Sequence, residues 1–221
     1  MLTPEVNFDC ERVSTALHRA LDGAPGSVCV MRGGEALLDE VSGSWAHEPD
    51  GNATRVFGFS LTKGVTATVV AWLVGSGRLD YEQRIASVWP EFAAHDKQDV
   101  TLGMLLTHQA GLSAIPEWLD EDPGRYPDAA AIEAALAAGA PSYEPGTACG
   151  YHALTFGWLV NGFIRRATGS TIRDHAVELF QDLGIEEIAL RSSDVPPGAK
   201  VAPLEGLHDA AAAASASQTP T

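Results

Sequence analysis

The chain has 221 residues, of which 45% are hydrophobic and 19% charged, so it has the composition of a globular protein long enough to bury a core. Fourteen basic and 29 acidic side chains give a formal net charge of −15. That charge argues against nucleic acid or an anionic membrane surface as a partner, because a polyanion would be repelled. Three cysteines, Cys10, Cys29 and Cys149, are too few and too dispersed for a disulfide framework or a zinc site.

The N-terminal segment lacks an apolar core of signal-peptide length, and acidic residues come early in it. No uninterrupted apolar stretch approaches the length of a membrane span. We therefore expect a soluble, cytoplasmic protein whose cysteines are reduced.

The first predicted elements are a helix and a hairpin. An apolar stripe predicts an amphipathic helix over residues 4–21. Residues 27–32 and 35–45 have strand character and are separated by Gly33-Gly34, a strong two-residue turn signal. These features predict an antiparallel hairpin close to the N-terminus.

A loop over residues 46–57 leads to a predicted helix from Ser60 to about Val74, which Gly75 and Gly77 end. Its interior, "VTATVVAWLV", is apolar on nearly every face. We therefore expect this helix to be surrounded by protein.

Shorter helical segments follow, and they outnumber the strands. Periodicity and capping residues predict helices over 101–109, 128–138, 152–169 and 171–184. Residues 185–191 are a strand candidate. The low-complexity composition of residues 209–221 predicts a disordered tail. One domain over residues 1–208, with an α/β (α+β) organisation, is the expected arrangement.

Ser60 and Lys63 stand at the start of the apolar helix in the sequence "GFSLTKG". Residues three apart lie on one helix face, so the hydroxyl and the ammonium are expected to be neighbours. Free N–H groups at a helix start favour an oxyanion there. A neutral lysine base at pH 7 would need its pKa lowered by about 3 units, roughly 4 kcal/mol. The alternative interpretation is a plain N-cap serine beside a solvated lysine.

Other hydrolytic motifs are missing from the sequence. "GFSLT" lacks the second glycine of the G-x-S-x-G elbow. H-E-x-x-H, C-x-x-C and G-x-x-x-x-G-K-[ST] do not occur, so metal-dependent hydrolysis and phosphate-loop chemistry have no sequence support. The seven histidines are dispersed.

Three segments in this order, "FSLTKGVTATVVAWLVGSGRLDYEQRIASVWPEF", "TLGMLLTHQAGL" and "PGTACGYHALTFGWLVNGFIRRATG", resemble the serine β-lactamase-related superfamily. Within it, the chain is most similar to class C-like members and family VIII carboxylesterases, over about residues 5–205. The resemblance implies a β-lactamase/transpeptidase-like fold, with an antiparallel sheet and a helical region.

The resemblance also implies roles for individual residues. Ser60 would be the nucleophile, Lys63 its activating partner, and Tyr151 the tyrosine of the Y-x-N element. Ala153 stands where class C-like enzymes have asparagine, which weakens the case for β-lactam recognition. His152 is a candidate substrate-binding residue, although a histidine that merely starts a helix is an equally good interpretation.

A Ser–Lys–Tyr cluster implies acyl transfer without metal or organic cofactor. A phenol titrates near ~10, and a neighbouring lysine cation would lower that pKa. Ser60 would attack the carbonyl of a small ester, or of an amide or β-lactam, and form an acyl-enzyme, while Lys63 and Tyr151 relay the proton. Which of the two takes the first proton stays open.

The chain departs from the family pattern after Tyr151. No K-T-G or H-x-G type triplet follows, where a further strand would supply an oxyanion-hole N–H. We therefore expect a C-terminally truncated chain with an incomplete sheet, which would self-associate through an exposed sheet edge. A catalytically inactive fragment, or a binding module, is the alternative function.

Overall fold

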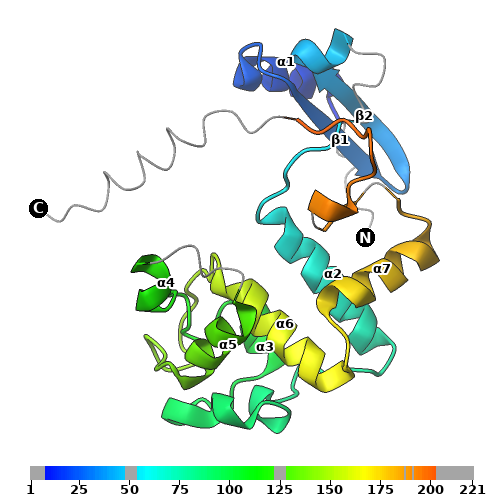
Figure 1. Ribbon diagram of the computed structural model, residues 1–221. Helices are drawn as coiled ribbons and strands as arrows, with labels where there is room; N and C mark the ends of the chain where they lie inside the picture. The colour runs from blue at the N-terminus through cyan, green and yellow to red at the C-terminus, as the bar shows by residue number, and fades with distance from the viewer. Residues whose placement is uncertain (1–7, 48–53, 122–127, 187, 191, 203–221) are drawn as a thin grey trace, which may run out of the picture. The chain divides into compact units, whose positions relative to one another are not determined.

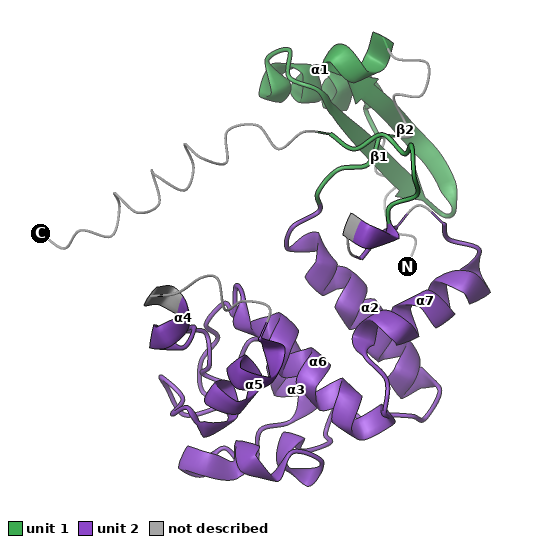
Figure 2. Ribbon diagram, viewed as in Figure 1, with its two compact units in different colours: residues 1–57, 195–221 green, residues 58–194 purple. Residues whose placement is uncertain are grey.

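The computed structural model describes residues 8–47, 54–121, 128–186, 188–190 and 192–202 (Figure 1). The chain divides into two compact units: residues 1–57 with 195–221 form unit 1, and residues 58–194 form unit 2 (Figure 2). The expected tail over 209–221 lies outside the described residues, as does the start of the helix expected from residue 4.

Unit 1 contains a helix and a two-stranded antiparallel sheet. Their bounds are Cys10–Leu21 for α1, Gly26–Arg32 for β1 and Glu35–Ser42 for β2. The two residues between the strands, Gly33 and Gly34, have φ angles of 60° and 87°, as a type I′ turn requires. The predicted hairpin is confirmed, and α1 packs beside β2.

The second strand is shorter than the predicted 35–45. It ends at Ser42, and Gly43–His47 form the 3-10 helix η1. Gly43 has a φ angle of 69°, and a Cβ there would lie 2.5 Å from the Ala24 carbonyl oxygen. The chain therefore turns away from the sheet at a position that only glycine fits.

Unit 2 is helical in its described residues. Its elements are α2 (Leu61–Gly75), η3 (Ile85–Ser87), η4 (Pro90–Asp96), α3 (Leu102–Leu106), α4 (Glu117–Glu121), α5 (Ala129–Ala138), α6 (Thr155–Thr168), α7 (Ile172–Leu183) and η6 (Ser192–Asp194). Thr101 caps α3 and Asp128 caps α5 with side-chain bonds, as their sequences suggest. Together with the hairpin of unit 1, these helices confirm the mixed α/β class.

The described hydrophobic core lies wholly in unit 2. Its buried apolar residues run from Val69 to Leu179, and the largest fully buried members include Trp89, Phe92 and Phe163. Burial of each such side chain contributes about 1.5–3 kcal/mol. Gly162 allows α6 to pack closely against Trp89, because a Cβ at position 162 would lie 2.9 Å from the Trp89 ring.

The expectation that α2 is surrounded by protein is wrong for its first half. Val69, Val70 and Leu73 are buried, but Leu61 is 76% exposed. The helix is therefore covered mainly along its second half, where it packs against α7.

The predicted strand over 185–191 is also wrong for its described residues. Positions 185, 186 and 188–190 carry no strand assignment, and 187 and 191 lie outside the described residues. A strand needs a neighbour to satisfy its backbone groups, and α7 instead ends at Gly184 in a left-handed cap.

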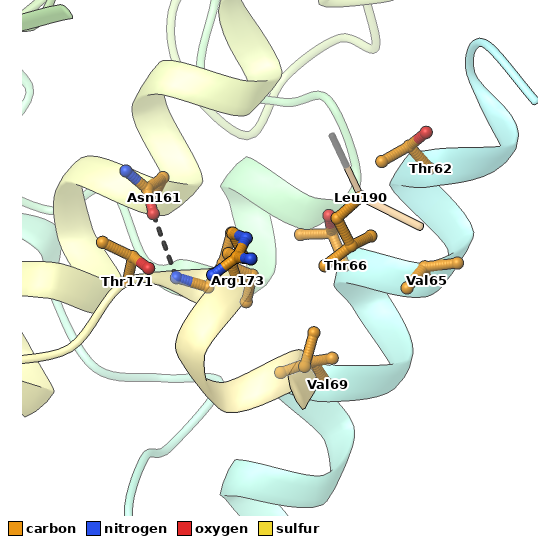
Figure 3. A pocket seen from close by; sticks show the side chains of 10 residues that line it. Thr62, Val65, Thr66, Val69, Asn161, Thr171, Arg173 and Leu190 are labelled. Carbon is orange, nitrogen blue, oxygen red and sulfur yellow. Dashed lines mark hydrogen bonds between the residues drawn. The ribbon is translucent and has the colours of Figure 1, made fainter. Parts of the chain in front are cut away.

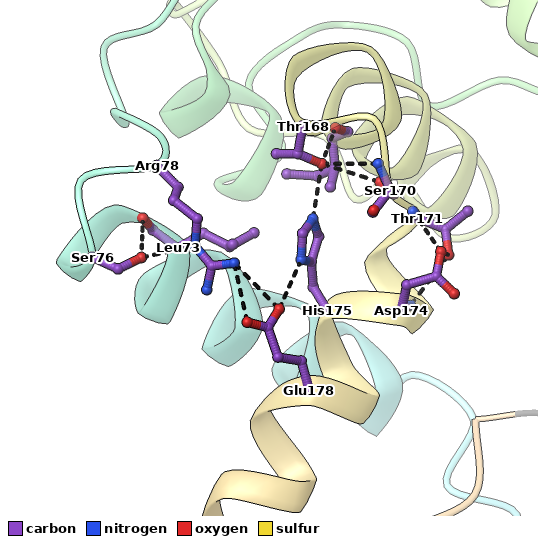
Figure 4. Close-up of polar contacts among 10 residues, drawn as sticks. Leu73, Ser76, Arg78, Thr168, Ser170, Thr171, Asp174, His175 and Glu178 are labelled. Carbon is purple, nitrogen blue, oxygen red and sulfur yellow. Dashed lines mark hydrogen bonds and ion pairs between the residues drawn. The ribbon is translucent and has the colours of Figure 1, made fainter.

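A polar cluster joins the ends of three helices in unit 2 (Figure 4). His175 of α7 lies 2.8 Å from Thr168 Oγ1 of α6 and 3.5 Å from Glu178. Arg78, which follows α2, donates two hydrogen bonds to Glu178. These contacts satisfy a largely buried histidine and tie α7 to both neighbours.

Lys97 is fully buried beneath η4 and α5. Its Nζ donates to the carbonyl oxygens of Ala94, at 2.6 Å, and Gly139, and lies 5.5 Å from the Phe92 ring centroid. Burial lowers the pKa of Lys97. The side chain thus links two segments through backbone acceptors.

Candidate active site

Ser60 stands directly before α2, at the N-cap position, but its side chain makes no capping bond. Instead, its Oγ accepts a hydrogen bond from Lys63 Nζ at 3.2 Å. The first turn of the segment is closed by the Leu61 N–H on the Gly58 carbonyl, at 2.8 Å. This geometry favours the reactive pair over the plain N-cap interpretation.

Lys63 connects the start of α2 to the segment around Ala153, which lies 90 residues later in the chain. Its Nζ donates to the Ala153 carbonyl oxygen at 2.8 Å and lies 4.9 Å from the Tyr151 ring centroid. The Phe156 ring lies below the same amine, 5.8 Å away. Two acceptors and two ring faces therefore hold the amine between Ser60 and Tyr151.

Tyr151 is 55% exposed and points its phenol toward this pair. Hydrogen bonds with Ser60, and then with Lys63, lower its pKa; burial opposes them, and the Lys63 charge adds a smaller lowering effect. The structure thus brings Ser60, Lys63 and Tyr151 into one cluster within unit 2.

His152, the candidate substrate-binding residue, is 1% exposed. Its Nε2 accepts the Leu112 N–H at 3.0 Å, and its Nδ1 lies 2.6 Å from the Gly150 carbonyl oxygen. Burial, foremost, and nearby His108 lower its pKa. With both ring nitrogens engaged by backbone, the contacts favour the alternative interpretation, a histidine that fixes the start of a helix.

The structure adds participants that sequence reasoning missed. His108 contacts the Tyr151 ring edge-on, with centroids 4.9 Å apart, and Lys63 uses the backbone carbonyl of Ala153. His108 lies in "TLGMLLTHQAGL", but seven dispersed histidines left it unmarked. A carbonyl contact has no sequence signal at all, since every residue carries one.

Two hollows in the described surface of unit 2 are lined by residues other than the three clustered ones. One of about 200 Å³ runs along the other side of α2, lined by Thr62, Thr66, Asn161 and Arg173 among others (Figure 3). There Asn161 accepts a hydrogen bond from the Ile172 N–H. The candidate site is therefore defined by the contacts of the cluster, in which Ser60 and Tyr151 are exposed.

No group of three or more His, Cys, Asp or Glu residues within the described ranges is placed to hold a metal ion. None of the helices described there combines the length and hydrophobicity needed to cross a membrane.

Comparison with known proteins places these observations in a family. The Beta-lactamase family model matches residues 15–218. The esterase/beta-lactamase LipL of Mycobacterium tuberculosis is 37% identical over 153 residues, which are 67% of this chain and 34% of that protein.

Solved structures agree. A penicillin-binding protein homologue from Caulobacter crescentus superposes with a TM-score of 0.73 at 34% identity, over 89% of this chain and 54% of that one. A family VIII carboxylesterase gives 0.69 at 32% identity, over 95% and 59%. The chain therefore spans about a third of the curated relative and somewhat over half of these structures. The matched residues, 15–218, include the whole Ser60 cluster, and the chain belongs to the beta-lactamase family.

Proposed function

We propose that this chain carries the nucleophilic centre of a serine hydrolase that cleaves small esters through an acyl-enzyme on Ser60. The observation that carries the proposal is the contact of Lys63 Nζ with Ser60 Oγ at 3.2 Å, while the same amine lies 4.9 Å from the Tyr151 ring centroid. The relatives named as an esterase/beta-lactamase and a family VIII carboxylesterase support this class of reaction.

Tyr151 is the first proton acceptor in this proposal. Lys63 donates to two oxygens and faces two aromatic rings, which is the environment of an ammonium. Hydrogen bonding with Ser60, and then with Lys63, lowers the pKa of Tyr151, so its phenolate becomes accessible nearer neutral pH. A base with a lowered pKa in the same cluster as Ser60 is suited to general-base catalysis.

The reaction then proceeds in two balanced steps. Ser60 Oγ attacks the ester carbonyl carbon while its proton passes to Tyr151, and the proton returns to the departing alkoxide as the C–O bond breaks. Water next attacks the acyl carbonyl carbon and gives a proton to Tyr151. Tyr151 returns the proton to Ser60 Oγ as the acyl C–O bond breaks, which frees the acid and the Ser60 hydroxyl. The backbone N–H of Ser60 itself would donate to the oxyanion, because the N–H groups of Leu61, Thr62 and Lys63 are bonded to carbonyls.

Apolar side chains around Ser60 favour small apolar esters as substrates. Phe59 is 62% exposed, Leu61 76% and Leu154 50%. They offer contact surface to an acyl or alcohol group and no charged partner for it. Amides and β-lactams stay secondary candidates, because Ala153 replaces the asparagine of class C-like enzymes.

Fluorophosphonate labelling of the full chain tests this function directly. We expect a single covalent adduct on Ser60, located by peptide mass spectrometry, and loss of short-chain p-nitrophenyl ester turnover in Ser60→Ala. Ser87→Ala, a serine in η3 away from the cluster, is the matched control and should label and turn over as the wild type does. An unlabelled Ser60 would instead support the alternative, a catalytically inactive module that binds partners.

Two further expectations belong to the same proposal. The chain would reside in the cytoplasm, which cell fractionation tests. It would self-associate through the outer edges of β1 and β2, the two strands of the described sheet. Light scattering should then show species larger than 23.3 kDa that increase with concentration.

A further inference from the structure

The segment that carries Tyr151 is bound on both sides by His108, a residue from another part of unit 2. The His108 carbonyl oxygen accepts the Gly150 N–H at 3.1 Å, and His108 Nδ1 accepts the His152 N–H at 3.2 Å. The residues before and after Tyr151 therefore each donate a backbone N–H to His108. A tyrosine held on either side in this way has little freedom to rotate its backbone away from Ser60.

The His108 ring completes this hold. It meets the Tyr151 ring edge-on, with centroids 4.9 Å apart, and stacks against His152 at 5.5 Å. Phe156 of α6 closes the other side at 5.3 Å. His108 itself has a φ angle of 62°, a left-handed conformation that is uncommon for residues other than glycine, although Asn, Asp and His adopt it more often than other side chains. Such a backbone outlier persists where its surroundings fix it.

From this geometry we infer that His108 is a positioning residue, which holds Tyr151 against Ser60 and Lys63 only while its Nδ1 is an unprotonated acceptor. The expected effect on turnover rests on the proposed function, but the positioning of Tyr151 by His108 does not depend on that function. Protonation would turn Nδ1 into a donor facing the His152 N–H, so the contact would be lost and the loop released.

The charged and titratable neighbours of His108 act in one direction. Burial, and then the positive charge of Lys63, lower its pKa, so the neutral acceptor form persists below the usual range of histidine. Tyr151 and His152 flank the ring, and the Tyr143 hydroxyl donates to its carbonyl at 2.9 Å. The Cys149 thiol donates to the neighbouring Thr107 carbonyl. The support for Tyr151 should thus be complete at neutral pH and fail as the pH falls through the lowered pKa of His108.

Two substitutions separate the acceptor from the backbone conformation. His108→Gly tolerates the left-handed φ angle but has no acceptor. His108→Asn tolerates the same angle and places an amide oxygen near the position of Nδ1, without titrating. His95→Gly is the matched control, because His95 also has a left-handed φ angle, 54°, but is exposed in η4.

The first readout is the ionisation of the Tyr151 phenol in the full chain, followed by NMR of ring-labelled tyrosine and assigned with Tyr151→Phe. Because it needs no substrate, it tests the positioning even if no ester is ever turned over. We expect His108→Gly to raise the Tyr151 pKa by about one unit as its bonds to Ser60 and Lys63 loosen. His108→Asn and His95→Gly should leave it unchanged. An unchanged pKa in His108→Gly would overturn the inference.

The second readout is ester turnover against pH. His108→Gly should lose on the order of 10-fold in kcat with KM nearly constant, as expected when a reacting group is misplaced. His108→Asn should keep most of kcat and lack the loss at acid pH that the wild type shows. If His108→Gly does not fold, nitrogen NMR of the wild-type ring decides: a proton on Nδ1 at neutral pH would refute the assignment.

Discussion

Unit 2 is stabilised internally by a hydrophobic core, whereas unit 1 is organised mainly by a β-hairpin. Every buried apolar side chain in the described residues belongs to unit 2, between Val69 and Leu179. In the described part of unit 1, Ser42 is the one buried residue, and the hairpin is organised by its Gly33-Gly34 turn and its ladder. A two-stranded sheet of this kind is marginally stable in water.

The difference shows what the candidate site depends on. Ser60, Lys63, Tyr151 and His108 all lie in unit 2, whose core fixes α2, α3 and α6 relative to one another. The proposed chemistry therefore needs the hydrophobic core, whereas the hairpin should be separable from it in stability.

The strongest way to break this comparison is to create matched cavities in the two units. Phe163→Ala in α6 should lower the free energy of unfolding by about 3–5 kcal/mol, because the side chain is fully buried. Val30→Ala in β1 should cost less than about 1 kcal/mol, since that site is only half-buried. Amide hydrogen exchange under native conditions resolves the two units. Equal effects of the two substitutions on unit 2 would show that the units unfold together.

The next largest effect concerns the reacting groups of unit 2. Lys63→Ala and Tyr151→Phe should each lower kcat for ester hydrolysis by on the order of 10², about 2.7 kcal/mol, because each removes a contact to Ser60. The double variant should lose little more, since the residues act as a unit. Losses that multiply would mean that they act independently. Tyr81→Phe, at an exposed tyrosine elsewhere in unit 2, is the control.

Two glycine substitutions test the same difference between the units with smaller expected changes in stability. Gly34→Ala should destabilise the hairpin by about 1 kcal/mol, because φ at that position is 87°. Gly64→Ala should stabilise α2 by about 0.5–1 kcal/mol, since this glycine lies inside the helix and a Cβ would meet no atom within 4 Å. Hydrogen exchange of strand and helix amides would check both. A change in the hairpin amides on Gly64→Ala would show that the units are coupled.

The smallest expected effect is at Ala153. Lys63 binds the backbone carbonyl of this residue, which any side chain would leave in place. Ala153 is also exposed, so a larger side chain has room. Ala153→Asn should keep ester turnover within about two-fold and should give no cephalosporin hydrolysis, measured by loss of β-lactam absorbance. Efficient cephalosporin hydrolysis by this variant would show that position 153 alone had limited β-lactam recognition.

Local sequence patterns predicted the elements whose stability is local. The hairpin follows from Gly33-Gly34, and α5 and α7 follow from their capping residues and helix formers. The strand expected over 185–191 failed, because a strand requires a partner that its own residues cannot specify. The cover of α2 was overestimated for a similar reason, since hydrophobicity shows what can be buried and not what is present to bury it.

The site was only partly accessible from sequence. Ser60 and Lys63 are three residues apart on one helix, so their contact follows from helix geometry. Tyr151 came from the family resemblance. His108 could not be recognised, because its contacts depend on how the 150–152 segment folds against the end of α3.

The burial of Lys97 has a practical consequence. The chain contains only three lysines, and this one is enclosed in unit 2 with its amine on two carbonyl oxygens. An amine-acylating reagent can reach it only when the segment around η4 opens. The acetylation rate of Lys97, relative to that of exposed Lys200, therefore measures how often the helical core opens locally. The chain carries this reporter in its natural sequence, without an introduced probe.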